Sequence, residues 1–218
     1  MKNNRKNIVI IDYKLGNLFS VKQACESVGI ETKISSEYKD IRYADALILP
    51  GVGAFNEAML NLKKLNLFNP IKNANENNIP IFGICLGLQL LFEESEEFKS
   101  SKGLGILSGN VVKFPSKQEK TELRIPHIAW NQINISTKLK NETPLRNIKE
   151  DSFMYFVHSY YVKPNNNNIV LSMTNYENVK YCSSVFHKNI FATQFHPEKS
   201  GKVGLKIYKD WASMNNLI

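Results

Sequence analysis

Residues 83–87 read Gly-Ile-Cys-Leu-Gly and contain the side chain best suited to nucleophilic chemistry, that of Cys85. The segment follows the apolar run 79–82 and leads into the apolar residues 88–92, as a strand-to-helix junction does. Glycines on both sides of a cysteine allow the tight, strained turn of a nucleophile elbow, which pushes the central side chain out of the backbone. The alternative is that Cys85 is a small buried residue and that the glycines only allow close packing. This motif alone leaves both interpretations open.

The position of Cys85 at the start of a helix would also activate it. Unpaired backbone N–H groups and the positive end of the helix dipole favour the thiolate, which is the reactive form of cysteine. The N–H of Leu86, next after the nucleophile, is positioned to donate to a developing oxyanion. The pattern therefore predicts attack of Cys85 on a carbonyl carbon.

A thiolate with this role needs a base, usually histidine, and a group that orients the imidazole. Residues 194–200 read Gln-Phe-His-Pro-Glu-Lys-Ser and directly follow an apolar strand. In extended geometry His196 and Glu198 project to the same side, and Pro197 stiffens the backbone between them. We interpret these two residues as base and orienter. The other histidines, His127, His158 and His187, are interpreted as structural. For His127 and His187, the alternative is a surface loop near the site.

The first half of the chain alternates between apolar runs and helical patterns. Strands are predicted at 7–11, 31–34, 46–49 and 79–82, and helical spacing at 18–28, 55–62 and 86–92. This alternation predicts parallel strands joined by right-handed crossovers, with helices on both faces of the sheet. Ligands bind such sheets at the carboxyl ends of the strands, where residues 12–17, 50–53 and the Cys85 turn lie.

Beyond residue 110 the pattern changes to short β-like runs. They occupy 111–114, 130–135, 153–157, 169–174, 181–186 and 190–193 and predict antiparallel strands that extend or flank the parallel core. Residues 204–211 predict a closing helix. The predicted fold class is α/β, with three layers, a mostly parallel central sheet, flanking helices and additional antiparallel strands. We expect one domain, 1–218, because no linker divides the chain and the Asn-rich residues 165–168 fit a loop between strands.

Composition limits the compartment and the partners. The cysteines, Cys25, Cys85 and Cys182, are odd in number and lack metal-ligand spacing, so we expect a reduced, cytoplasmic protein with no disulfide, metal or cofactor. The basic start, 1–7, precedes too few apolar residues for a signal peptide or a membrane span. The net charge is +8, but the lysines are spread along the chain, so we expect no nucleic-acid partner and no membrane partner.

Separated motifs in this chain resemble those of the class I, or triad, glutamine amidotransferases. They are residues 50–53 (Pro-Gly-Val-Gly), residues 83–97 around Cys85 and residues 194–200 around His196, and their order and separation fit the family. More narrowly, three further segments are similar to the glutaminase subunit of imidazole glycerol phosphate synthase: 13–17, 126–131 and 155–160. The resemblance covers nearly the whole chain.

The resemblance implies a Cys85–His196–Glu198 triad that hydrolyses glutamine to glutamate and ammonia through a thioester. In the family, residues 50–53 form the oxyanion strand, in which a backbone N–H must turn inward, so the implied oxyanion hole consists of Gly51, Val52, Gly53 and Leu86. Four further positions match residues that hold the α-amino and α-carboxyl groups of glutamine: Gln89, Glu97, Ser159 and Tyr160. The alternatives are a helix-surface role for Gln89 and a solvated acidic run that includes Glu97.

A partner follows from the chemistry, because ammonia is largely protonated in neutral water and this chain shows no acceptor domain. The resemblance implies a heterodimer with a (β/α)8-barrel cyclase subunit of histidine biosynthesis. Three positions match the subunit junction where ammonia crosses: Asn17, Trp130 and Tyr155. For the two aromatic residues, ordinary core packing is the alternative.

The pathway stays open at this point. Lys14 and Ala129 stand where the histidine-pathway subunits often have a smaller residue and a glycine, and both loops face the partner. A paralogous subunit that supplies ammonia to an amidine-forming, surface-sugar synthase is therefore an alternative. A stand-alone γ-glutamyl hydrolase is another, which the junction motifs disfavour. A non-catalytic binding module is the third, and the intact triad disfavours it.

Overall fold

The computed structural model describes residues 6–98, 100–118 and 121–218. Residues 1–5, which belong to the basic segment where no signal peptide was expected, lie outside the described residues. Within the described residues, none of the helices combines the length and the apolar character needed to cross a membrane.

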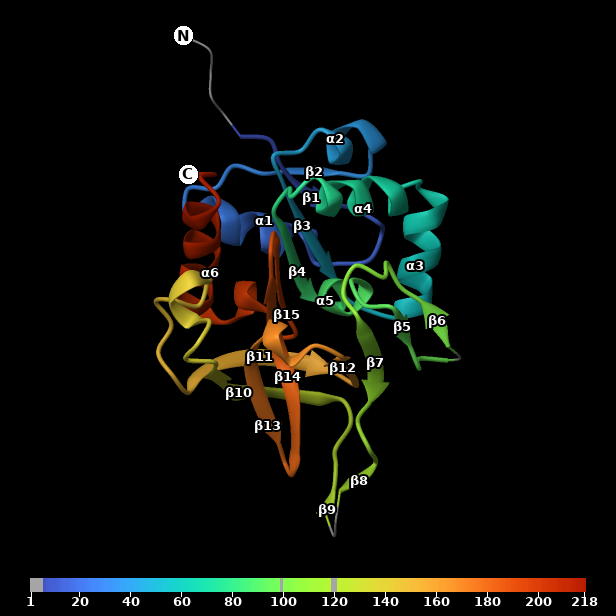
Figure 1. The fold of residues 1–218 in the computed structure, drawn as a ribbon, viewed down its shortest axis with the longest axis vertical. Coiled ribbons are helices and arrows are strands. Elements are labelled where there is room, and N and C mark those ends of the chain that lie inside the picture. Colours follow the sequence, from blue (N-terminus) through green and yellow to red (C-terminus); the bar gives the residue numbers. More distant parts are fainter. Residues whose placement is uncertain (1–5, 99, 119–120) are drawn as a thin grey trace.

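Parallel strands form the centre of the fold (Figure 1). Their order across the sheet is β2 (Lys33–Ser35), β1 (Ile8–Ile11), β3 (Ala46–Gly51), β4 (Ile81–Cys85) and β15 (Ile190–Thr193). Their side chains alternate between two hydrophobic cores: Ile8 and Ile10 enter one, and Val9 and Ile11 enter the other. Burial on both faces explains the uninterrupted apolar runs in the sequence, and the α/β prediction is confirmed.

Helices cover both faces of this sheet. One core contains α1 (Leu18–Ser27) and α6 (Gly201–Met214), which lie together on one side in Figure 1. The other core contains α2 (Tyr38–Arg42), α3 (Phe55–Lys64), α4 (Phe68–Glu76) and α5 (Leu86–Leu90). The arrangement is the expected three-layer one, with the sheet between two helical layers.

The second half of the chain extends the sheet with mostly antiparallel strands (Figure 1). These are β7 (Gly109–Lys113), β10 (His127–Ile135), β11 (Ser152–His158), β12 (Tyr160–Pro164), β13 (Val170–Tyr176) and β14 (Val179–His187). Shorter elements accompany them: β5 (Glu94–Ser95), β6 (Ser101–Lys102), β8 (Lys117–Gln118), β9 (Thr121–Glu122) and the 3-10 turns η1 (Lys140–Glu142), η2 (Asn167–Ile169) and η3 (Pro197–Lys199).

Strand β15 corrects the prediction for residues 190–193. The sequence grouped this run with the antiparallel strands, but β15 pairs parallel with β4, and only its other edge is antiparallel, to β14. The β14–β15 hairpin inserts β15 beside β4, because both strands are buried and apolar. The register pairs Thr193 with Ile84, so the residues that follow β15 emerge beside Cys85.

Several elements were not predicted from the sequence. Helices α2 and α4 were missed because α2 is short and α4 carries Pro70 and three asparagines, which weaken a helical pattern. Strand β12 was missed, although the Asn-rich segment does connect two strands, β12 and β13.

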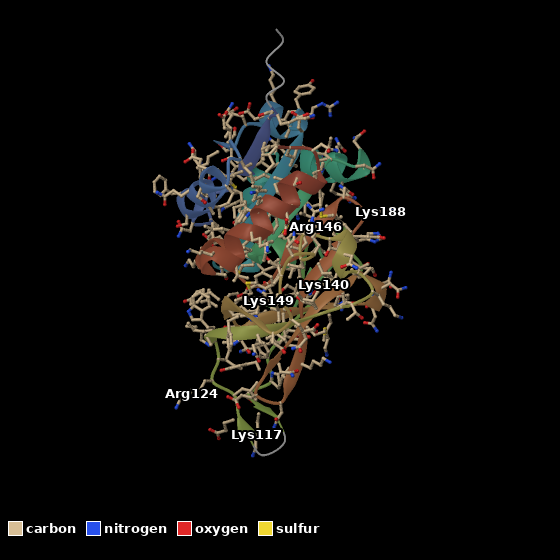
Figure 2. The ribbon with its side chains drawn as sticks, turned by 90° about the vertical axis from the view of Figure 1, so that its left-hand side faces the viewer. Lys117, Arg124, Lys140, Arg146, Lys149 and Lys188 are labelled. Atoms are coloured by element: carbon tan, nitrogen blue, oxygen red, sulfur yellow. The ribbon has the colours of Figure 1, made fainter. Side chains whose placement is uncertain are left out.

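The basic side chains come from many separate elements. Figure 2 labels Lys117 on β8, Arg124, Lys140, Arg146, Lys149 and Lys188, which lie spread along one side of the molecule. Arg146 is partly neutralised by Asp210, 3.7 Å from Nε to Oδ1. That the protein has no nucleic-acid partner stays a prediction. The spread of positive charge over separate elements is consistent with it.

Candidate active site

Cys85 occupies a strained turn between β4 and α5. Its backbone angles are φ 55° and ψ −108°, a combination that residues other than glycine rarely adopt. Helix α5 begins at the next residue. The turn places the side chain at the carboxyl end of β4, between β3, where Gly51 pairs with Cys85, and the segment that follows β15. This is the geometry of a nucleophile elbow.

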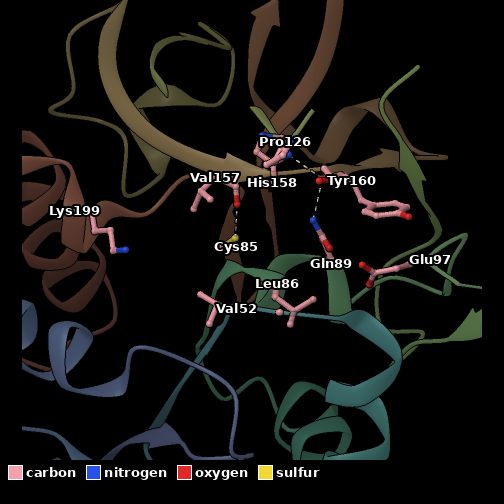
Figure 3. Close-up of a pocket in the computed structure, with 12 residues that line it drawn as sticks. Val52, Cys85, Leu86, Gln89, Glu97, Pro126, Val157, His158, Tyr160 and Lys199 are labelled. Atoms are coloured by element: carbon pink, nitrogen blue, oxygen red, sulfur yellow. Dashed lines mark hydrogen bonds between the residues drawn. The ribbon is translucent and has the colours of Figure 1, made fainter. Parts of the chain in front are cut away.

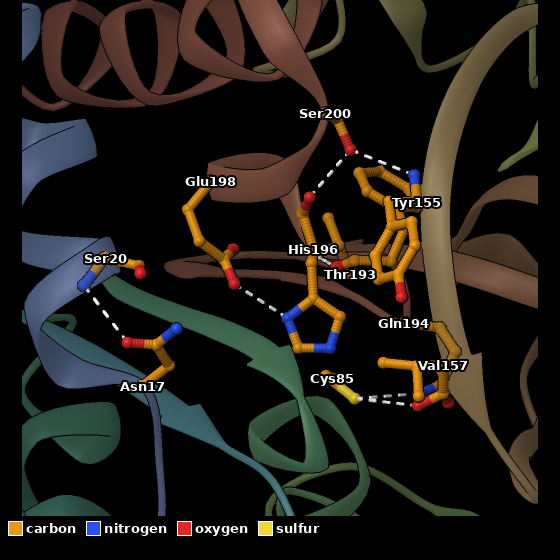
Figure 4. A network of polar contacts seen from close by, with 11 residues as sticks. Asn17, Ser20, Cys85, Tyr155, Val157, Thr193, Gln194, His196, Glu198 and Ser200 are labelled. Carbon is orange, nitrogen blue, oxygen red and sulfur yellow. Dashed lines mark hydrogen bonds and ion pairs between the residues drawn. The ribbon is translucent and has the colours of Figure 1, made fainter. Parts of the chain in front are cut away.

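His196 and Glu198 meet as the sequence spacing predicted. His196 Nδ1 lies 2.7 Å from Glu198 Oε1, and both side chains are almost fully buried. The second carboxylate oxygen of Glu198 is buried with no hydrogen-bond partner among the described residues, so its negative charge acts mainly on the imidazole. His196 Nε2 has no partner with full hydrogen-bond geometry there either, and the ring lies close to Cys85 (Figure 4).

Charge in this site favours the imidazolium form of His196. Burial alone would lower its pKa, but the adjacent Cys85 thiolate and the Glu198 carboxylate outweigh burial and raise the pKa of His196 to about 10. At neutral pH the histidine can therefore hold the proton that a leaving amine needs.

The segment that carries His196 is fastened to β11. The His196 N–H donates to the Tyr155 carbonyl at 2.9 Å. The Ser200 hydroxyl donates to the His196 carbonyl at 2.7 Å and accepts from the Tyr155 N–H at 3.0 Å (Figure 4). These bonds fix the backbone on both sides of the imidazole, and sequence reasoning did not single out Ser200.

A cavity of about 400 Å³ opens beside Cys85 (Figure 3). This volume lies within the range of small-molecule sites. Residues predicted for the oxyanion hole or for glutamine binding line it: Val52, Gly53, Leu86, Gln89, Glu97, Ser159 and Tyr160. The cavity also has walls that the sequence did not predict, from Pro126, Val157, His158 and Lys199.

Gln89 and Glu97 are both held in place at the cavity. Gln89 is buried, and its Nε2 donates to the Tyr160 carbonyl at 3.0 Å, so the helix-surface alternative is wrong. Glu97 accepts a hydrogen bond from the Phe55 N–H at 2.5 Å, at the first turn of α3. That helix has no side-chain cap at Ala54, so its first N–H groups lack a partner within the helix. Glu97 accepts from one of them, and the alternative that placed Glu97 in a solvated acidic run is wrong. Their contacts with glutamine stay predictions.

The predicted oxyanion segment lies against Cys85 and is anchored by Tyr13. The buried Tyr13 hydroxyl donates to the Pro50 carbonyl at 2.7 Å. A Cβ at Gly51 would stand 1.8 Å from this hydroxyl, so the contact requires glycine. Gly53 has φ +97°, and Val52 and Leu86 border the cavity. The inward turn of an N–H here stays a prediction.

The remaining histidines lie outside the triad, and two of them, His127 and His158, are buried. His127 is fully buried on β10, 3.3 Å from His158 through Nδ1 and Nε2, and burial lowers the pKa of His127 to about 4. Burial also lowers the pKa of His158 to about 3. His187 pairs with Ile190 at the amino end of β15, the end opposite to Cys85. The alternative that placed His127 and His187 on a surface loop near the site is therefore wrong.

The predicted junction residues lie around the site without lining the cavity. Asn17 is exposed and caps α1 by accepting from the Ser20 N–H at 3.3 Å. Trp130 is 52% exposed, so it is not a core residue, whereas Tyr155 is half-buried with its ring centre 6.0 Å from that of Trp130. Lys199 Nζ lies 5.6 Å from the centre of the Tyr155 ring.

The elbow glycine Gly87 gives a stability prediction. A Cβ at this position would lie 1.7 Å from the Leu49 carbonyl oxygen, so Gly87→Ala must push α5 away from β3. We expect a loss of about 3 kcal/mol or more in the free energy of unfolding, measured by urea denaturation. The matched control is Gly105→Ala, where a Cβ meets nothing within 4 Å and only the φ of +62° is unfavourable, at about 1 kcal/mol. Equal losses in the two variants would contradict the close approach.

Comparison with known sequences places this geometry in a family context. The model of the family "Glutamine amidotransferase class-I" matches residues 9–212. The subunit HisH of imidazole glycerol phosphate synthase from Prochlorococcus marinus is 48% identical over 205 residues, 94% of either chain. HisH from Aquifex aeolicus is 47% identical over 204 residues, 93% of this chain and 94% of that one.

Solved structures share the fold at low sequence identity. A glutamine amidotransferase crystal structure superposes with a TM-score of 0.71 at 17% identity, over 95% of this chain and 98% of that chain. PurLQS from Thermotoga maritima superposes with a TM-score of 0.69 at 17% identity, over 96% of this chain and 98% of that chain. The fold is therefore shared with proteins whose sequences have diverged far from this one.

Proposed function

The chain belongs to the class I glutamine amidotransferase family, and from this premise we propose that it is the glutaminase subunit of an imidazole glycerol phosphate synthase. It hydrolyses glutamine to glutamate and ammonia and passes the ammonia to a synthase subunit for histidine biosynthesis. The contact that carries the proposal is the 2.7 Å bond between His196 and Glu198, with the imidazole close to the elbow cysteine. Identities of up to 48% over nearly the whole chain support the pathway.

The proposed mechanism uses the triad in two half-reactions. The Cys85 thiolate attacks the side-chain amide carbon of glutamine, and the imidazolium of His196 gives its proton to the departing ammonia, which leaves a γ-glutamyl thioester. A water molecule then loses a proton to His196 as it attacks the thioester, and glutamate is released as the thiolate re-forms. Glu198 stabilises the imidazolium each time it forms. The backbone N–H groups proposed at Val52 and Leu86 donate hydrogen bonds to the oxyanion.

We propose that the synthase subunit is a separate (β/α)8 barrel that docks on an apolar face of the β10–β11 ladder. Paired residues of this ladder are Ile128 with Val157, Trp130 with Tyr155 and Gln132 with Phe153. Alternate residues share one face of a strand, so all six lie on one face. Ile128, Trp130 and Phe153 are each more than half exposed, which is unusual for large apolar side chains so close together. The face ends at Val157, in the cavity wall beside Cys85, which would give ammonia a short route to the partner.

Further features suit this proposal. A single domain over 1–218 is supported by the continuous sheet and by the family match over 9–212. A cytoplasmic location is supported by the free cysteines, Cys25, Cys85 and Cys182.

The direct test combines the chain with the barrel subunit encoded beside it. Glutamine and the phosphoribosyl-formimino aminoimidazole carboxamide nucleotide should yield imidazole glycerol phosphate, and glutamate release by the isolated chain should be slow. A barrel that binds but makes no such product would refute the histidine pathway and favour another acceptor, such as a surface sugar. Rapid glutamate release by the isolated chain would favour a stand-alone hydrolase.

The docking face gives a separate prediction. Trp130→Asp puts a charge in the middle of the apolar face, and we expect binding of the barrel to weaken at least about tenfold. Isothermal titration with the barrel subunit measures this. The matched control is Tyr43→Asp, at another exposed aromatic residue, located between α2 and β3. Equal effects of the two substitutions would argue against the β10–β11 face.

A further inference from the structure

A buried glutamine outside the triad contacts the nucleophile. Gln194 follows β15, and the pairing of Thr193 with Ile84 brings it beside Cys85. Its side chain is fully buried, and its Nε2 lies 3.7 Å from Cys85 Sγ (Figure 4). A buried amide next to a reactive sulfur has a fixed orientation only if its other end is also bonded.

Gln89 supplies that second bond and sets the direction of the Gln194 amide. The Nε2 group of Gln89 donates to the Tyr160 carbonyl at 3.0 Å and to Gln194 Oε1 at 3.1 Å. Since the carbonyl can only accept, the group on Gln89 that faces both partners must be the NH2. The oxygen of Gln194 must then face Gln89. A reversed Gln194 would set two donors against each other and an oxygen against the sulfur.

The backbone around Cys85 makes this N–H necessary. The Val157 carbonyl oxygen lies 3.9 Å from Sγ. It can accept a hydrogen bond from the thiol, but it repels the thiolate. An amide N–H on the same sulfur offsets that repulsion, because hydrogen bonds to an ionised acceptor are stronger than those to a neutral one.

We propose that Gln194 is a positioning residue for the nucleophile, which donates one amide hydrogen to the Cys85 thiolate in an orientation fixed by Gln89 and the Tyr160 carbonyl. The inference rests on the proposed function in one respect, because the proposed function assigns Gln89 to binding the α-amino and α-carboxyl groups of glutamine. The glutamine-binding wall of the cavity and the sulfur then belong to one chain of hydrogen bonds. The position of the bound substrate and the hydrogen bond to the thiolate therefore depend on each other.

Alkylation of Cys85 by iodoacetamide tests the inference without any need for glutamine. The reaction is followed against pH by mass spectrometry of the Cys85 peptide. Gln194→Met keeps the length of the side chain but has no hydrogen to donate, and we expect the midpoint of the pH profile to rise by about one pH unit. Cys25 and Cys182 do not interfere, because burial raises the pKa of each thiol to about 12. The control is Gln23→Met, on the exposed surface of α1.

The other titratable groups around Cys85 are unchanged in these variants. Tyr13 has its pKa raised well above 10 by burial, and His158 has its pKa lowered to about 3, so neither titrates in the range of the experiment. Glu97, Tyr160 and Lys199 line the same cavity and are present in every variant. His196 shares its proton with the sulfur, so the midpoint belongs to the pair, and its shift between variants reports on Gln194.

A second variant keeps the inference testable if Gln194→Met does not fold. Gln89→Met leaves Gln194 in place but releases its oxygen, so that the amide can turn, and we expect a smaller rise in the midpoint, about 0.3 to 0.5 pH unit. An unchanged midpoint in folded Gln194→Met, or in Gln89→Met where only that variant folds, overturns the inference. A chain that releases no glutamate with any synthase but shows both shifts would refute the proposed function and leave the role of Gln194 standing.

Discussion

Replacement of Cys85 by alanine is expected to reduce glutamate release in the presence of the barrel subunit by at least about 10⁴-fold, because no other group in the cavity can form the thioester. Alanine keeps a Cβ in the strained turn at φ 55°, so the elbow and the partner face should keep their shape. The measurement is glutamate release by the complex at saturating glutamine, together with the affinity of the variant for the barrel, which should not change.

The other two cysteines provide matched controls. Cys25 and Cys182 are buried, at 0% and 3% exposure, and burial raises the pKa of each thiol to about 12, so both stay protonated and unreactive at neutral pH. Cys25→Ala and Cys182→Ala should lower the stability of the fold slightly and leave glutamate release per folded molecule intact. Full activity of the Cys85→Ala complex would refute the assignment of the nucleophile.

The parts of the site that the sequence predicted correctly depend on short spacings. The elbow glycines bracket Cys85 within five residues, and His196 and Glu198 are two residues apart on a segment that Pro197 stiffens. Such local patterns determine a local geometry whatever the rest of the chain does. The parallel core was predictable for a related reason, since strands buried on both faces show continuous apolar runs.

The parts that were missed depend on strand register across long separations. Gln194 touches Cys85 only because β15 inserts beside β4, and sequence reasoning had assigned that run to the antiparallel set. Tyr13 reaches the Pro50 carbonyl across 37 residues, and Val157 reaches the sulfur across 72. No periodicity within one segment reports such contacts. His127 fits the structural interpretation, because it lies fully buried on β10, and only the alternative of a surface loop was wrong.

The pKa of His196 turns the geometry of the triad into a pH dependence. Burial disfavours the imidazolium, yet the Cys85 thiolate and the Glu198 carboxylate raise its pKa to about 10. Because the pKa of His196 is higher in the folded state, protonation of His196 stabilises the fold, and this stabilisation is fully present at a pH below the ordinary histidine pKa of 6.5. This stabilisation is lost as the pH rises through about 10. Activity that needs the imidazolium should decline over the same alkaline range, because His196 can then no longer protonate the leaving ammonia.

Glu198→Gln is therefore expected to lower the pKa of His196 and to reduce kcat/KM for glutamine by about 10² to 10⁴-fold in the complex. The amide keeps the size of the side chain but supplies no charge to the imidazolium, and it can present an NH2 to Nδ1, which favours the wrong tautomer. The alkaline decline of kcat/KM should move toward neutral pH, as measured by glutamate release across the pH range. The control is Glu76→Gln, an exposed carboxylate on α4, which should leave both the rate and the profile unchanged. A lower rate with an unmoved alkaline decline would mean that Glu198 orients the ring without setting its charge.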